Sequence, residues 1–220
     1  DGVIDDSVAI QQAVHASRCC GGCVFLPPGA YYVGKTIELC GKTECGTCLR
    51  GSSGTGVDKV AGWTPPNVLV LGPKDQPAIS VSGSRDGITI SDISVKGGAT
   101  GIYVAGSSGV RMVNVAVSAH VDADGVAGDP SQNVVLGSMN APLVVENSFN
   151  LWFERCSFDS LDLSQPPRRQ PAPAPLPKRT GHRPAVIFRS AERPDDSVLC
   201  FADAVALVQF DRTEFQGGGI

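Results

Sequence analysis

Three residues that could perform acid–base or metal chemistry stand close together in the middle of the chain. His120, Asp122 and Asp124 occur within the run HVDADGV at positions 120–126. An imidazole beside two carboxylates can relay a proton or bind a metal ion. A polar turn, of the kind that Asp and Gly favour, is the alternative interpretation of the same run.

Further candidates depend on a repeat of short apolar strands. A three-residue strand of alternating polarity is followed by a tight turn and a second strand, which begins eight or nine residues after the first. The first strands begin at Ile79, Ile102, Val126, Leu143 and Leu199, and the second strands at Ile88, Val110, Val134, Leu151 and Val208. Alternation buries one face of each strand, and a unit this small buries that face only by stacking on the next. The repeat therefore predicts an all-β solenoid in preference to a sandwich or barrel, whose hairpins need not recur at a constant offset.

In such a stack the outward side chains of the second strands line up in columns. One column holds Thr89, Arg111, Val135, Trp152 and Gln209, and the neighbouring column holds Ser91, Val113, Gly137, Glu154 and Asp211. If the units that begin at Leu143 and Leu199 are adjacent, Glu154 and Asp211 lie about 5 Å apart, which is the spacing between neighbouring strands. The pattern thus predicts a surface pair of carboxylates.

A Glu154–Asp211 pair could perform acid–base catalysis, because two close carboxylates move each other's pKa values apart. A separation of about 5 Å also matches the carboxyl groups of retaining glycosidases. A shared Ca²⁺ ion is a second possibility for such a pair. Beside it, Trp152 could stack on a sugar ring and Arg111 could pair with a uronate carboxylate, while Gln209 and His120 are further candidates for substrate binding. The alternative is that these positions are only the solvated face of a solenoid.

The N-terminal region predicts a capped end for this stack. Asp5 or Asp6 can cap an α-helix whose apolar stripe is Ile10, Ala13 and Val14. A helix laid over the first unit would cover an end of the solenoid that otherwise exposes apolar surface and strand edges.

Cysteines are concentrated in the same region. Six of the eight are candidates for disulfides: Cys19, Cys20, Cys23, Cys40, Cys45 and Cys48. So many cysteines favour two or three disulfides and an oxidising compartment. The alternative is zinc, because Cys20 with Cys23 and Cys45 with Cys48 form two CxxC pairs near the spacing of a zinc ribbon. Disulfides are the preferred interpretation, since Cys23 leads into a strand rather than into the hairpin that a ribbon needs.

Two N-terminal segments resemble a known family. The run DGVIDDSVAIQQAV at positions 1–14 and the run VFLPPGAY at positions 24–31 are similar to the start of the rhamnogalacturonase/epimerase-like domain of the pectate-lyase superfamily. The resemblance implies a right-handed parallel β-helix, of which this chain would be the N-terminal part. It also implies an extracellular protein that acts on polysaccharides.

The same resemblance makes Asp122 and Asp124 catalytic candidates. Polygalacturonases within the superfamily carry Asn-Thr-Asp-Gly-Ile before a strand, and residues 122–126 look like a degenerate version, with Asp124 at the place of the catalytic Asp. The Asp-Asp pair expected one unit later is replaced by Asn-Ala-Pro at 140–142, and no Gly-His-Gly or Arg-Ile-Lys segment follows. Asp124 would therefore lack the second carboxyl group that glycoside hydrolysis ordinarily needs.

One domain is expected over residues 1–220. A helix and cysteine-rich cap would occupy 1–50, and repeat units would occupy 67–220, with a Pro-rich, basic loop inserted at 163–184. The abrupt C-terminus predicts that further units follow. A net charge of −4 and the lack of an apolar run long enough to span a bilayer argue against nucleic-acid and membrane partners.

These features predict a secreted or cell-surface protein that cleaves an acidic, pectin-like polysaccharide, as a glycosidase or as a lyase. No cofactor is expected for hydrolysis, whereas β-elimination would use a base and often Ca²⁺. Incomplete catalytic motifs keep a second hypothesis open, namely a non-catalytic carbohydrate-binding or structural β-helix like those of adhesins and tail spikes. The sequence leaves the oligomeric state open.

Overall fold

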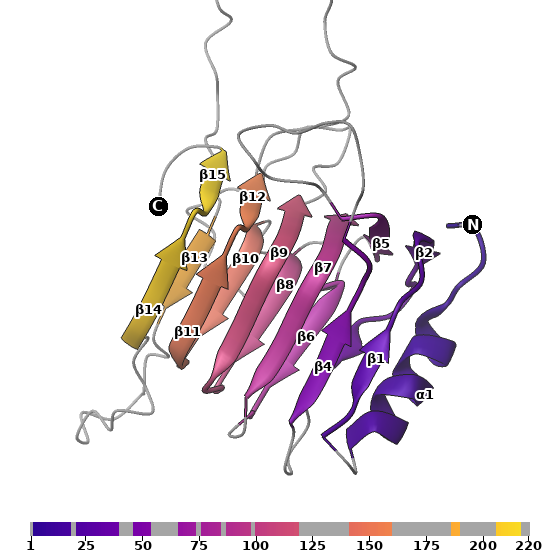
Figure 1. Ribbon diagram of the computed structural model, residues 1–220, viewed down its shortest axis with the longest axis horizontal. Coiled ribbons are helices and arrows are strands. Elements are labelled where there is room, and N and C mark those ends of the chain that lie inside the picture. The colour runs from indigo at the N-terminus through magenta and orange to yellow at the C-terminus, as the bar shows by residue number, and fades with distance from the viewer. Residues whose placement is uncertain are drawn as a thin grey trace, which may run out of the picture.

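The computed structural model describes residues 2–18, 21–39, 46–53, 66–73, 76–84, 87–97, 100–118, 141–159, 186–189 and 206–216. Within these ranges one helix near the N-terminus, α1 (Ser7–Arg18), is followed by short strands (Figure 1). Every pairing between these strands is parallel. The protein is therefore mostly β structure in parallel sheets, in agreement with the predicted class.

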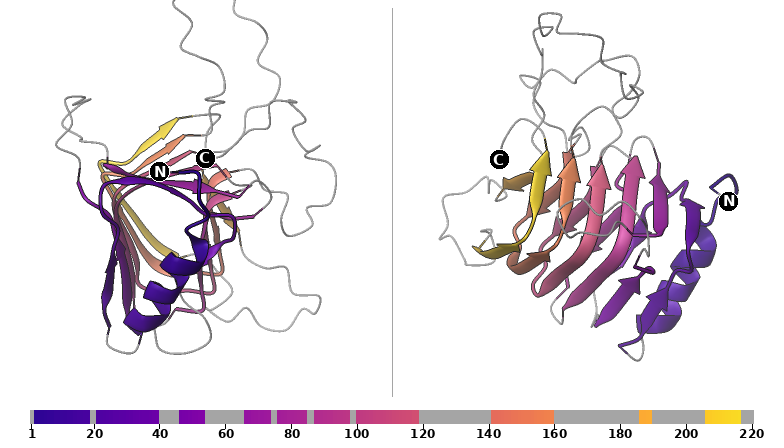
Figure 2. Two further views of the ribbon diagram at one scale, coloured as in Figure 1. Left: turned by 90° about the vertical axis from the view of Figure 1, so that its right-hand side faces the viewer. Right: turned by 45° about the horizontal axis from the view of Figure 1, so that its top comes forward.

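The strands form two sheets that face each other (Figure 2). The first sheet runs in the order β1 (Cys23–Phe25), β4 (Thr47–Arg50), β7 (Ile88–Gly97), β9 (Val110–Ser118), β11 (Phe149–Glu154) and β14 (Ala206–Asp211), and is extended by β2 (Gly29–Tyr32), β5 (Val68–Gly72), β12 (Ser157–Asp159) and β15 (Glu214–Gln216). The second sheet runs in the order β3 (Ile37–Glu38), β6 (Ile79–Ser82), β8 (Thr100–Ala105), β10 (Ala141–Glu146) and β13 (Val186–Arg189). The chain passes repeatedly from one sheet to the other, and each strand pairs with its counterpart in the next turn. This arrangement is consistent with a parallel β-helix.

Apolar side chains fill the space between the sheets. Two rows of them are in register across successive turns, with Ile79, Ile102, Leu143 and Val186 in the second sheet and Ile90, Met112 and Phe153 in the first. Each of these side chains is at most 2% exposed. The inward stack that alternation predicts for Ile79, Ile102 and Leu143 is thereby confirmed.

Two of the adjacencies that the repeat implies differ from the observed strand pairing. The repeat puts a unit at 126–136 between those of Ile102 and Leu143, but β8 pairs directly with β10, and β9 pairs directly with β11. Leu143 has Val186 as its next partner, and not Leu199. Both predictions are wrong, because a strand has only two edges and these edges are occupied. Positions 126–136 and 199–201 themselves lie outside the described residues.

Three buried serines turn the chain from the second sheet into the first. The backbone N–H of Ser84 donates to Oγ of Ser107 at 3.2 Å, and the N–H of Ser107 donates to Oγ of Ser148 at 3.1 Å. The hydroxyls of Ser107 and Ser148 donate in turn to the carbonyls of Ala105 and Glu146. Buried amides need acceptors, and this serine ladder supplies one from each following turn of the chain.

Helix α1 covers the N-terminal end of the stack (Figure 2). Ile10 and Val14 pack into the core as predicted, but Ala13 is exposed and Ser7 completes the buried stripe instead. Positions 7, 10 and 14 follow the helical period of 3.6 residues, whereas position 13 falls on the outer side. No helix of the described ranges is long and apolar enough to cross a membrane.

The helix also saturates the free backbone edge of β3. The side-chain amide of Gln11 accepts the N–H of Glu38 at 2.8 Å and donates to its carbonyl at 3.0 Å. Arg18 donates to the same carbonyl, and Oγ of Ser7 accepts the N–H of Lys35. An unpaired strand edge is a template for aggregation, so these four bonds make α1 a cap in the physical sense.

Asp5 anchors the start of α1, as one of the two predicted capping residues. Its Oδ1 accepts the backbone N–H of Ser7 at 2.9 Å and that of Gly34 at 3.0 Å, and also accepts the Ser7 hydroxyl. The hydroxyl bond, followed by the two amide bonds, lowers the pKa of Asp5 to about 2 from its ordinary value of 3.8. Hydrogen bonds to a carboxylate favour its ionised form.

We expect Asp5→Asn to remove part of the acid dependence of folding. Because the pKa of Asp5 is lower in the folded state, its stabilising contribution is complete above about pH 4 and is lost as the pH falls from 3.8 to about 2. The variant should therefore melt below the wild type at pH 7, and the two should converge near pH 2. Thermal unfolding by circular dichroism between pH 2 and 7 measures this. Asp6→Asn is the control, since it removes the same charge without those bonds, and an equal convergence in Asp6→Asn would contradict the assignment.

Cys23 and Cys48 form a disulfide between β1 and β4, where they are register partners. Disulfide bonding of these two is thus confirmed, and the zinc alternative, which uses both thiolates as ligands, is wrong for them. The other four early cysteines, Cys19, Cys20, Cys40 and Cys45, lie outside the described residues. A disulfide fits an oxidising compartment.

Candidate functional site

The outer face of the first sheet gathers the predicted binding residues into one row. Trp152 is the register partner of Arg111 on β9 and of Gln209 on β14, and Arg111 is that of Thr89 on β7. Trp152 points outward because alternation places its neighbours Leu151 and Phe153 in the core, and its ring remains 39% exposed. The row predicted from the repeat is therefore real, except that Arg111 and Trp152 are direct neighbours and Val135 does not separate them.

Glu154 and Asp211 are also register partners, as the sequence predicts. Neighbouring strands lie about 4.8 Å apart, so the two residues occupy adjacent positions on the same face. On its other side Glu154 has Val113 as its partner. Gly137, predicted between Val113 and Glu154 in this column, lies outside the described residues.

Glu154 is engaged by two guanidinium groups of the protein. Its Oε2 lies 3.1 Å from Nη2 of Arg111, and its Oε1 lies 3.4 Å from Nη2 of Arg155. The Arg111 guanidinium also lies 5.9 Å from the centre of the Trp152 ring, within reach of a cation–π contact. Both oxygens of the predicted catalytic carboxylate are thus in ion pairs, and Arg111 already has a carboxylate partner.

A corner within β7 and β9, and directly after β11 and β14, repeats a left-handed backbone conformation. Asp92, Asn114, Arg155 and Arg212 occupy equivalent places in successive turns, with φ between 45° and 56°. In the first two, Nδ2 of Asn114 donates to Oδ1 of Asp92 at 2.8 Å, and Asp92 lies 3.8 Å from Nε of Arg50. Sequence analysis missed this column, although a polar residue that recurs two positions after each three-residue second strand was a signal for it.

The structure does not describe the other predicted site residues. His120, Asp122 and Asp124 lie outside the described residues, and their catalytic and binding roles stay predictions. Among the residues that the structure does describe, no group of three His, Cys, Asp or Glu side chains is arranged to hold a metal ion.

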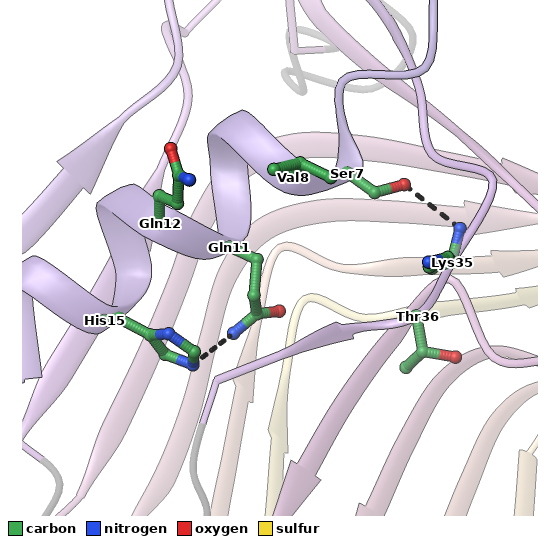
Figure 3. A pocket seen from close by; sticks show the side chains of 7 residues that line it. All are labelled: Ser7, Val8, Gln11, Gln12, His15, Lys35 and Thr36. Atoms are coloured by element: carbon green, nitrogen blue, oxygen red, sulfur yellow. Dashed lines mark hydrogen bonds between the residues drawn. The ribbon is translucent and has the colours of Figure 1, made fainter.

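A shallow depression of about 230 Å³ lies elsewhere, between α1 and the segment that leads into β3 (Figure 3). Its lining includes Val8, Gln11, His15, Lys35 and Thr36, and it contains none of the residues predicted for the site. Gln11 and Ser7, which point into it, are already bonded to the edge of β3. The depression is thus a consequence of the cap.

Comparison with known proteins supports no assignment to a family. No protein-family model matches the chain, and no curated protein matches it. Among solved structures it is similar to ORF18 of Geobacillus virus E2, with 19% identity and a TM-score of 0.49 over 72% of this chain and 28% of that one. It is similar, at the same identity and TM-score, to PfbA, a surface adhesin of Streptococcus pneumoniae, over 93% of this chain and 43% of that one. The chain spans less than half the length of either structure, and likenesses this distant leave the resemblance to the pectate-lyase superfamily unconfirmed and carry no argument about activity.

Proposed function

We propose that this protein is a non-catalytic β-helix that binds polysaccharide along the outer face of its first sheet. The observation that carries the proposal is the row of Arg111, Trp152 and Gln209, in which an exposed indole ring stands between two hydrogen-bonding side chains. A sugar ring offers an apolar face to an aromatic ring and hydroxyl groups to its neighbours. Successive turns present such groups at a constant spacing of about 4.8 Å, which suits a polymer.

Binding without cleavage is favoured by the state of Glu154. Glycoside hydrolysis ordinarily needs two carboxyl groups, one to protonate the leaving group and one to act as base or nucleophile. Each oxygen of Glu154 already pairs with a guanidinium group, that of Arg111 at 3.1 Å and that of Arg155 at 3.4 Å, so a substrate would have to compete with both arginines for this carboxylate. The arrangement therefore supports recognition better than acid–base chemistry.

The proposal includes the handedness and class of the β-helix and the location of the protein. We place the protein among right-handed β-helices of the pectate-lyase type, on its N-terminal motif and on the rule that parallel crossovers are right-handed in about 98% of cases. We place it outside the cell or on its surface, because the Cys23–Cys48 disulfide is stable in an oxidising environment.

Trp152→Ala tests the proposal. If the exposed ring stacks on sugar, its removal should weaken binding to the bound members of a polysaccharide panel by about 10-fold or more, since buried aromatic anchors dominate interface energies. The panel should include polygalacturonate and rhamnogalacturonan, each with and without Ca²⁺, with affinities from titration calorimetry or affinity electrophoresis.

Tyr32→Ala is the matched control, because Tyr32 on β2 is an aromatic residue of similar exposure, 37%, away from the row. Its affinities should equal those of the wild type. Reducing ends and the absorbance of unsaturated products should be followed in the same mixtures. Binding to no polysaccharide would overturn the proposal, and so would new reducing ends that depend on Glu154 and Asp211.

A further inference from the structure

Two arginines adopt a backbone conformation that arginine rarely adopts. Arg155 has φ of 51° and Arg212 has φ of 45°, in the left-handed region. They directly follow the register partners Glu154 and Asp211, and the N–H of Arg155 donates to the carbonyl of Asp211 at 2.8 Å. The two residues therefore occupy the same place in adjacent turns of the chain.

The equivalent places in earlier turns show what this corner accepts without strain. There the chain has Asp92 and Asn114, which are the residue types most tolerant of a left-handed conformation after glycine. The same corner in the last two described turns has arginine both times. Strained backbone conformations cluster at functional sites, so the two arginines motivate a functional hypothesis for this corner.

The charges around the corner leave guanidinium groups in excess. Glu154 is shared by Arg111 at 3.1 Å and Arg155 at 3.4 Å, so one carboxylate serves two cations. The side chain of Arg155 is 45% exposed, and Arg212 is exposed as well. Asp211, which is also exposed, is the other acidic residue of the column that contains Glu154, so two carboxylates stand against three guanidinium groups. A chain with a net charge of −4 thus has three arginines on or directly after these columns, and one of them, Arg111, lies 5.9 Å from the centre of the exposed Trp152 ring.

We propose that Arg155 and Arg212 form an oxyanion site that reads carboxylate or sulfate substituents on the bound polysaccharide. A guanidinium group presents a planar fork of donors that matches both kinds of anion. The backbones of Arg155 and Arg212 are one strand spacing, about 4.8 Å, apart, so both side chains can reach substituents of a polymer that runs along the row of Arg111, Trp152 and Gln209. This inference rests on the proposed function: it takes polysaccharide binding as given and adds that the bound polysaccharide is anionic.

Glu154 acts in this site as an internal competitor. Its carboxylate occupies the guanidinium groups of Arg111 and Arg155 in the way that a ligand anion would. Replacing it with glutamine keeps its shape and removes the negative charge that holds both guanidinium groups. Glu154→Gln is therefore expected to strengthen binding of anionic polymers, whereas loss of a structural ion pair alone would leave affinity unchanged or lower it.

The test compares polymers that differ only in charge. Polygalacturonate is paired with its methyl-esterified form and dextran sulfate with dextran, and affinities are measured at two salt concentrations. Arg155→Asn and Arg212→Asn should each reduce affinity for the bound anionic members about 10-fold or more, and affinity for the neutral members by less than about twofold. Each substitution should also raise the melting temperature by about 2 to 4 °C, because asparagine relieves the left-handed strain. A gain in stability separates lost recognition from poor folding.

Arg50→Asn is the matched control, since it removes an arginine from the same sheet face, beside Asp92 and away from Trp152. Its binding should match the wild type. Equal affinity of the wild type for charged and neutral members would overturn this inference alone, as would an undiminished anion preference in both corner variants. Binding to no polymer would overturn the proposed function with it, and equally tight binding of single-stranded DNA that also depends on Arg155 would overturn polysaccharide as the ligand.

Discussion

Replacing Phe153 with alanine is expected to lower the free energy of unfolding by about 3 to 5 kcal/mol. Phe153 is 0% exposed and lies on β11, between Met112 and Phe210 in the inward row of the first sheet. Its ring stacks on that of Phe210, with centroids 5.0 Å apart, and meets that of Phe158 edge to face at 5.9 Å. Truncation therefore removes buried area and leaves a cavity that touches two neighbouring rings.

The cavity should not close, because its walls belong to hydrogen-bonded strands in fixed register. β11 pairs with β9 on one side and with β14 on the other, so the backbone cannot move inward without breaking a ladder. Large-to-small substitutions cost most where the surroundings cannot relax. Phe210 should be affected as well, since it is 38% exposed and its stacking on Phe153 covers one of its faces.

Chemical denaturation of Phe153→Ala and Phe25→Ala measures the effect with the same change of side chain. Phe25 lies on β1 and is 57% exposed, so its loss should cost less than about 0.5 kcal/mol. Similar losses of stability in both variants would mean that Phe153 is not at the centre of the core that the register defines.

Alternation predicted the core well because it depends only on neighbours along the strand. Ile79, Ile102 and Leu143 face inward for the reason that the sequence shows, namely one apolar face per three-residue strand. Which turns of the chain stack on each other is a different question. The offset between two strands of one turn says nothing about the length of the connection to the next turn.

The two wrong adjacencies arise because the offset within one turn does not give the length of the connection to the next turn. Residues 126–136 carry the same alternation as a true unit, yet β8 and β10 pair without them. Leu199 was paired with Val208 by its offset, whereas Val186, 22 residues before Val208, is the residue that continues the row of Leu143. Alternating polarity and a constant offset within one turn therefore do not by themselves identify the stacking partner.

The serine ladder shows a second limit. The segments around Ser107 and Ser148 predict tight turns, because Gly, Ser and Asn favour them. Their burial has another cause, since the amides of one turn need acceptors that only the next turn can supply. A single sequence shows the composition of a turn but not the hydrogen-bonding demand of the turn stacked on it.

The sequence predicted part of the candidate site, and the part that it did not predict depends on which turns are stacked on each other. The columns of Trp152 and of Glu154 followed from alternation, and their register partners are those predicted on β14. The ion pair between Arg111 and Glu154 did not follow, because the predicted intervening unit separated the two residues. Removing that unit brings the guanidinium onto the carboxylate and changes the interpretation from catalysis to recognition.

Removing the disulfide should cost nearly as much as removing a core ring. The double variant Cys23→Ser and Cys48→Ser is expected to lose about 3 kcal/mol of stability, by the entropy of closing a loop of this size in the unfolded chain. The bridge spans 25 residues of sequence and joins the first two strands of the first sheet, next to the helical cap. Thermal unfolding with and without reductant measures the loss, and the reductant should have a smaller effect on the double variant.

The region that unfolds first in the double variant distinguishes a local loosening of the cap from a loss of stability of the whole fold. Contacts of α1 with β1, β3 and β4 hold the cap on the stack, so opening the β1–β4 bridge should loosen the cap before the central turns. Hydrogen exchange should therefore accelerate at Val24 and Leu49 while Ile90 and Met112 remain protected. Cys156→Ala is the control, because Cys156 is a free, buried thiol of the core whose loss lowers stability without reductant dependence. Uniform exchange throughout the sheet in the double variant would show that the cap and the central turns unfold as one unit, and the bridge would then stabilise the whole fold rather than its end.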